Sequence, residues 1–289
     1  MAASPHYVAH LAQKYQDEFQ RNVIETGDTI TITAREAVST VQQKVDSIAP
    51  TAIGFKDYFI SVVTDFKETK IQSNDILNIM LWSSILVLGS KITATLSHFL
   101  LHPFIHLVFD GSTALYLSAI FIPVYVHFKQ SREPLSEEKS RFRLLAYAGI
   151  QGLIVGYIQQ DSFLLFSDPF AFLGLAVMGL SGLFLHPVLG GNRLNYLVAV
   201  TGSGFGLHFV IGLLFGQLGF IYLLMALFYT VAAFILLQYY LNPVDSKAMP
   251  HLYMYYNFIA VMYIQLVFYY VFGYTKEDYK KLSVVSEKP

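Results

Sequence analysis

Residues 219–241 read GFIYLLMALFYTVAAFILLQYYL, a run of 23 residues without a charged side chain. About 20 apolar residues are enough for a helix to cross the hydrocarbon core of a bilayer, so this run predicts a transmembrane helix. Similar runs occupy residues 76–100, 107–128, 142–160, 169–189, 194–215 and 252–274. The sequence therefore predicts an all-α polytopic membrane protein with a seven-transmembrane helix bundle over residues 76–274.

The composition agrees with a membrane protein and excludes several other classes. Charged residues make up 13 % of the chain, against about 25 % in soluble domains. The net charge of −1 leaves no basic surface for nucleic acid. With no cysteine in the chain, a disulfide framework, a thiolate zinc site and a cysteine nucleophile are excluded.

Residues 1–75 carry much of the charge and predict an amphipathic helical arm. Val8, Leu11 and Tyr15 recur every three or four residues, which is typical of one apolar helix face. We expect this arm to bind a protein partner or the membrane surface. Residues 275–289 are expected to form a short polar tail.

The distribution of Lys and Arg predicts the orientation. The connector 129–143 holds five basic residues, whereas the connectors after the first, third and fifth runs hold none. Basic connectors stay on the cytosolic side, so the N-terminus is expected in the cytosol. The basic tail conflicts with this rule, and either it crosses or the last run dips and returns. Run 252–274 is uncharged and long enough to cross, which favours seven crossings.

Three charged residues lie in or at the ends of the predicted spans, all toward the luminal side: Lys91, Asp110 and Asp161. An ion pair from Lys91 to Asp110 or Asp161 would avoid an isolated charge in lipid. The alternative is that this charge cluster guards the luminal mouth of a polar path.

Uncharged polar residues also lie in the predicted spans, namely Gln151, His208, Gln238, Asn257 and Gln265. Hydrogen bonding between helices explains such residues. The functional alternative is a hydrated path lined by Gln238, Asn257 and Gln265, with calcium as a candidate permeating ion.

His98, His102 and His106 are spaced by four residues, as metal ligands on one helix face can be. Pro103 interrupts that helix, and no carboxylate stands at ligand spacing within the series, so we expect interfacial hydrogen bonding and no metal or other cofactor. No Gly-x-Ser-x-Gly elbow occurs, and we expect no enzymatic activity. A histidine-dependent membrane metalloenzyme stays open as an alternative.

Three junctions carry a resemblance to a known family. Residues 136–149 (SEEKSRFRLLAYAG) form a charged loop running into a helix, Asp168-Pro169 opens the fourth run, and residues 192–196 open the fifth. With the order of the spans over residues 70–274, these junctions resemble the Bax inhibitor family (transmembrane Bax-inhibitor-motif proteins). The last two runs contain no Asp or Glu, unlike the acidic pair to which that family's calcium leak is attributed.

The resemblance implies an endoplasmic-reticulum membrane protein that regulates cell death, stress signalling and calcium homeostasis, with a slow cation leak as its expected mode of action. On this hypothesis the partners are the lipid bilayer, calcium and a protein held by residues 1–75, and no nucleic acid. An unrelated membrane transporter or scaffold is the remaining alternative.

Overall fold

A computed structural model describes residues 54, 56–67, 71–97, 99, 110–132, 136–159, 162–164, 168–242 and 249–275. The chain divides into two compact units, Met1–Ser61 and Val62–Pro289. In the first unit, residues 56–61 are helical, and most of the predicted arm over residues 1–75 lies outside the described residues, as does the tail after Thr275. The remaining description concerns the second unit.

The described part of this unit is built from helices, which confirms the all-α class. Their order is α2 (Ser73–Leu96), α4 (Gly111–Tyr116), η2 (Leu117–Phe121), α5 (Ile122–Arg132), α6 (Glu137–Gln159), α7 (Ala171–Leu189), α8 (Arg193–Leu214), α9 (Phe220–Tyr240) and α10 (Pro250–Phe272). Two short strands, β1 (Ser162–Phe163) and β2 (Tyr274–Thr275), pair antiparallel and tie the segment after α6 to the segment after α10.

Within the described residues, six helical segments are long and apolar enough to cross a membrane: α2, the continuous rod Gly111–Arg132, α7, α8, α9 and α10. Large apolar side chains cover their outer faces, with Phe184, Phe220 and Tyr270 more than 70 % exposed. Such a surface suits lipid and not water. The protein is therefore an integral membrane protein by these criteria.

The predicted count of seven spans is not confirmed, and the difference lies in α6. This helix replaces the predicted run 142–160 and begins with Glu137, Glu138 and Lys139. Arg143 and Gln151 follow inside it, and these polar residues lower its mean hydropathy. Composition alone consequently assigns six spans.

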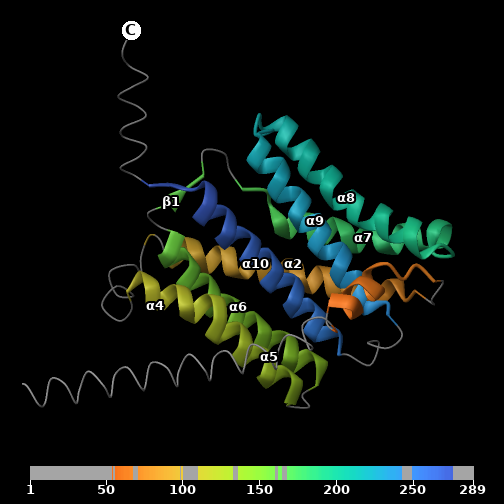
Figure 1. The fold of residues 1–289 in the computed structure, drawn as a ribbon, viewed down its shortest axis with the longest axis horizontal. Coiled ribbons are helices and arrows are strands. Elements are labelled where there is room, and N and C mark those ends of the chain that lie inside the picture. The colour runs from red at the N-terminus through yellow and green to blue at the C-terminus, as the bar shows by residue number, and fades with distance from the viewer. Residues whose placement is uncertain are drawn as a thin grey trace, which may run out of the picture. The chain divides into compact units, whose positions relative to one another are not determined.

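Helix α2 lies at the centre of the bundle and contacts α6, α7 and α10, with α10 crossing beside it in Figure 1. Gly152 and Gly156 let α6 approach the α2 backbone. A Cβ on Gly152 would lie 2.8 Å from the Ser90 carbonyl carbon, and one on Gly156 would lie 2.7 Å from the Ala94 Cα. This pair uses small residues for close helix contact, as is common in membranes.

Helices α7, α8, α9 and α10 continue from α2 as a closed ring, because each contacts the next and α10 returns to α2. Hydrogen bonds join neighbouring helices across the ring: Ser84 Oγ donates to the Phe172 carbonyl at 2.7 Å, and the Tyr196 hydroxyl donates to the Gly182 carbonyl at 2.8 Å. Met80, Met178, Met225, Met254 and Phe258 fill the core.

The rod Gly111–Arg132 contains the π-helical turn η2 just before Pro123. Pro123 has no N–H, so the carbonyl of Ala119 four residues earlier loses its partner within the helix. The Tyr263 hydroxyl of α10 donates to that carbonyl at 2.6 Å, and the Gln151 amide of α6 donates to the Ser118 carbonyl at 2.5 Å. Side chains of neighbouring helices thus satisfy the carbonyls that the irregular turn exposes.

Each of the helices α2, α7, α8 and α9 runs antiparallel to the next in the ring, and α10 runs parallel to α2. All their ends therefore gather at two opposite ends of the unit. We call one the Asp168 end: α2, α8 and α10 finish there, and α7 and α9 begin there. The opposite end is the Arg193 end. Contacts of Gly174 with His208 and of Gly182 with Tyr196 fix this register between α7 and α8.

Candidate functional site

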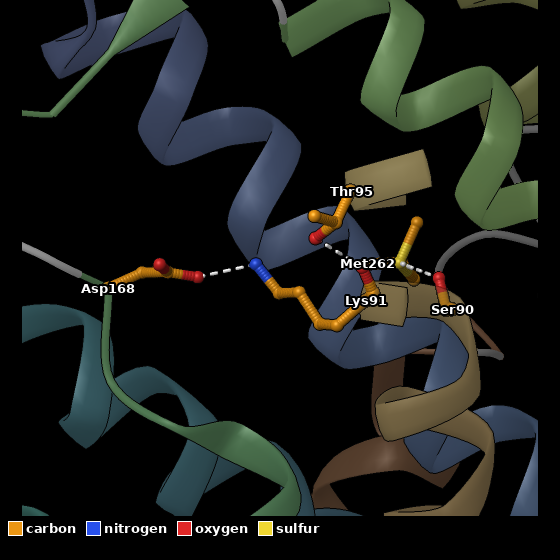
Figure 2. A network of polar contacts seen from close by, with 5 residues as sticks. All are labelled: Ser90, Lys91, Thr95, Asp168 and Met262. Carbon is orange, nitrogen blue, oxygen red and sulfur yellow. Dashed lines mark hydrogen bonds and ion pairs between the residues drawn. The ribbon is translucent and has the colours of Figure 1, made fainter. Parts of the chain in front are cut away.

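An ion pair marks the Asp168 end of the bundle (Figure 2). The ammonium of Lys91 on α2 lies 2.5 Å from the carboxylate of Asp168, which precedes α7. The two side chains are 35 % and 22 % exposed. On the other side of α2, the Ser90 hydroxyl lies 3.5 Å from the Met262 sulfur of α10. The ion pair therefore joins α2 to the start of α7 at the partly exposed Asp168 end of the bundle.

Three buried polar side chains lie deeper in the ring, and we call them the polar cluster: His208 on α8, Tyr229 on α9 and Gln265 on α10. Their exposed fractions are 1 %, 4 % and 1 %. The His208 and Tyr229 ring centroids are 6.3 Å apart. The Gln265 amide lies close to the Tyr229 hydroxyl but outside hydrogen-bond geometry.

The helices around the polar cluster fix the histidine ring. Gly174 of α7 faces it, because a Cβ at this position would lie 3.0 Å from the His208 Cε1. From α9, the Tyr222 hydroxyl donates to the His208 carbonyl at 2.9 Å. Gly174 thus leaves room for the imidazole against α7, and the Tyr222 hydrogen bond holds the α8 backbone at His208 against α9.

The polar cluster and the ion pair are electrostatic neighbours. The Asp168 carboxylate is near enough to Tyr222, Tyr229 and Tyr269 for its charge to act on them. The polar cluster, through Tyr229, therefore lies within electrostatic range of the partly exposed carboxylate.

A second buried group lies at the Arg193 end. Arg193 is 1 % exposed, and its Nη2 donates to the Gln238 carbonyl at 3.0 Å. The Gln238 amide donates to the Val63 carbonyl at 3.4 Å, and the Asn257 amide donates to the Tyr253 carbonyl at 3.1 Å. Two of the three residues of the predicted polar path therefore bond to backbone carbonyls, and only Gln265 belongs to the polar cluster. Whether the three line a path stays a prediction.

The predicted luminal charge cluster is rearranged. Lys91 pairs with Asp168, whereas Asp110 accepts a hydrogen bond from the Thr113 N–H at 2.8 Å and caps α4. This capping lowers the pKa of Asp110, chiefly through hydrogen bonds from Thr113. Asp161 lies outside the described residues.

The three candidate metal-binding histidines, His98, His102 and His106, also lie outside the described residues. Within the ranges that the structure describes, no group of three His, Asp or Glu side chains is placed to hold a metal ion.

Sequence reasoning missed Asp168, Tyr229 and Arg193 as members of these groups. The sequence could have indicated Asp168 as a partner for Lys91, since Asp168 directly precedes an apolar run and lies only seven residues after Asp161. Arg193 had a signal too, because it opens another run. Tyr229 had none, because it is one of 20 tyrosines and its neighbours are apolar.

Comparison with known proteins gives one match. The family model described as Interactor of ZYG-11 matches residues 2–275, which includes both the N-terminal segment and the helix bundle. No curated protein and no solved structure matches the chain significantly.

This match overturns the resemblance to the Bax inhibitor family, and with it the expected regulation of cell death, stress signalling and calcium homeostasis. The match also gives no support to a metalloenzyme or a transporter. The resemblance rested on charged connectors and an Asp-Pro junction, and multi-pass helical proteins in general need charged residues at such junctions. The expected endoplasmic-reticulum location came from the same resemblance and loses that support. The chain belongs to the Interactor of ZYG-11 family.

Proposed function

We propose that this integral membrane protein binds a protein partner of the ZYG-11 type and holds it at the membrane surface. The family match over residues 2–275 carries this proposal. The proposed role is binding and not catalysis.

The Arg193 end is the surface best suited to a soluble partner. The α5–α6 connection lies at this end, because Asn78 near the start of α2 donates to Glu137 at 3.5 Å. Its charged side chains are Lys129, Arg132, Glu137, Glu138, Lys139, Arg141 and Arg143. Arg132, Glu138 and Lys139 are exposed. At the other end, Lys91 is the one basic side chain within the described ranges. Since basic residues stay in the cytosol, this asymmetry supports a cytosolic Arg193 end.

The proposal includes a seventh crossing by α6. This helix runs parallel to α2 along its length, from Asn78 beside Glu137 at 3.5 Å to Ala94 beside Gly156. A helix that follows a membrane-spanning neighbour for 23 residues, about 34 Å, extends across a similar depth. Its polar face is turned to protein, as Gln151 is buried against Ser118. The N-terminus then faces the cytosol, with the partner at the Arg193 end.

Binding of the full chain to the partner tests the proposal. The chain in lipid nanodiscs is expected to retain a purified ZYG-11 protein on an affinity matrix, and the lack of any retention would refute the proposal. Within it, the pair E138K and K139E is expected to weaken retention, because both side chains are exposed at the charged end. S112E, which adds a charge to an exposed position at the Asp168 end, is the matched control and should leave retention unchanged.

A further inference from the structure

The polar cluster contains more buried polar atoms than its protein neighbours satisfy. His208 Nδ1 and Nε2, the Tyr229 hydroxyl and the Gln265 Nε2 have no hydrogen-bond partner among the described residues. Lipid supplies none either, so unsatisfied groups at this depth are strongly unfavourable. Native structures resolve such a conflict with a small bound molecule that makes two to four hydrogen bonds.

We propose that His208, Tyr229 and Gln265 form a binding site for water, or another small uncharged hydrogen-bonding molecule, that is reached from the Asp168 end. The three side chains come from three different helices and converge in one layer of the ring. The rings of His208 and Tyr229 are in tilted contact, with centroids 6.3 Å apart, so these two side chains lie side by side in that layer.

The donors and acceptors define the ligand chemistry. Neutral imidazole offers one donor and one acceptor, the Tyr229 hydroxyl offers both, and the Gln265 Nε2 donates. A molecule that both donates and accepts therefore fits. The site holds no free counter-charge, because Lys91 and Asp168 pair with each other at 2.5 Å. An ion in this layer would be unpaired at low dielectric, so the ligand is uncharged.

Access comes from one side. Asp168 is partly exposed at this end, and His208 and Gln265 lie six and seven residues from the ends of α8 and α10 that finish there, so this end is the shorter way in. Toward the Arg193 end, the buried residues of the next turns include Val200, Ala233 and Val261. The site is therefore a dead end and not a path across the membrane.

Radiolytic hydroxyl-radical footprinting of the unmodified full chain in nanodiscs tests the proposal, because radicals formed from bound water oxidise the side chains beside it. We expect oxidation at Tyr229 and His208 and protection at Met225 and Met178. Those methionines are equally buried, and their thioethers oxidise readily, so their protection excludes general penetration by radicals. Protection of Tyr229 and His208 to the level of Met225 would overturn the proposal.

Thiol labelling tests access from the Asp168 end, and it is simple because the chain has no other cysteine. We compare Q265C with M225C, two similar-sized replacements at fully buried positions. Met225 lies five residues into α9 and Gln265 seven residues from the end of α10, so depth alone favours labelling at 225. A small water-soluble methanethiosulfonate should instead modify Q265C at least about tenfold faster, since thiol reactivity follows access. Equal or reversed rates would contradict the proposal, and the footprinting result decides if Q265C does not fold.

Discussion

Replacing Gly156 with alanine should destabilise the contact between α6 and α2. A Cβ at this position would lie 2.7 Å from the Ala94 Cα and 2.8 Å from its carbonyl carbon, whereas ordinary contact begins at 3.4 Å. Every close atom belongs to the α2 backbone, so no side-chain rotation relieves the overlap. The Ala94 carbonyl oxygen would lie closer still, so the two helices must separate by at least about 0.7 Å, and overpacking of this kind costs about 1–3 kcal/mol.

A matched control isolates this steric cost. Gly206 lies within α8, and a Cβ there would meet nothing within 4 Å. G206A and G156A share the helix-propensity gain of about 1 kcal/mol for alanine over glycine. We therefore expect G206A to be neutral or stabilised and G156A to have a free energy of unfolding about 1–3 kcal/mol lower than G206A.

Trp82 provides the assay, because it is the single tryptophan of the chain and lies at this helix contact. Its ring packs edge-on against Phe142 of α6 at 6.1 Å, beneath the Arg141 guanidinium at 5.4 Å. Its fluorescence during unfolding by SDS in mixed micelles reports separation of α2 from α6, and circular dichroism reports helix loss. Equal midpoints for G156A and G206A would refute the close backbone contact.

Three further predictions concern polar contacts. A double-mutant cycle of K91M and D168N should give a coupling of about 0.5–1 kcal/mol in the free energy of unfolding. The coupling stays this small because both side chains are partly exposed, and solvent weakens their attraction. Zero coupling would mean that the ion pair does not form. Y196F removes a buried hydrogen bond to the Gly182 carbonyl and should cost about 1 kcal/mol, whereas Y270F at an 87 % exposed position should change nothing; equal effects would contradict the burial of Tyr196. Hydrogen bonds from Thr113 lower the pKa of Asp110 from 3.8. The Asp110 cap should therefore stabilise α4 above pH 3.8 and lose this effect as the pH falls through the lowered pKa. In an acid titration, the D110N variant should not show this loss of stability.

The helix positions could be predicted from the sequence, because a bilayer fixes how long an apolar run must be. The run 219–241 became α9 (Phe220–Tyr240), and 252–274 became α10 (Pro250–Phe272). The π-helical turn over Leu117–Phe121 could not be predicted, since it depends on Tyr263 and Gln151 of other helices. Pro123 was its only local signal.

The sequence indicated polar residues of the candidate site but not which of them lie next to each other. His208 and Gln265 stood out as polar residues in apolar runs. Their proximity depends on the register between α8 and α10, which apolar periodicity does not encode. The sequence offered Asp110 and Asp161 as partners for Lys91. In the structure its partner is Asp168, which precedes α7. In the same way, connector residues suggested a family that the match over residues 2–275 corrects.

The two proposed sites lie at opposite ends of one helix scaffold and should act independently. On α8 alone, Arg193 and His208 are 15 residues apart, or about 22 Å along the helix axis. Changes that far apart, without shared partners, usually add. E138K and K139E should therefore leave footprinting at Tyr229 unchanged, and a change there would mean that the ring of helices transmits partner binding through the membrane.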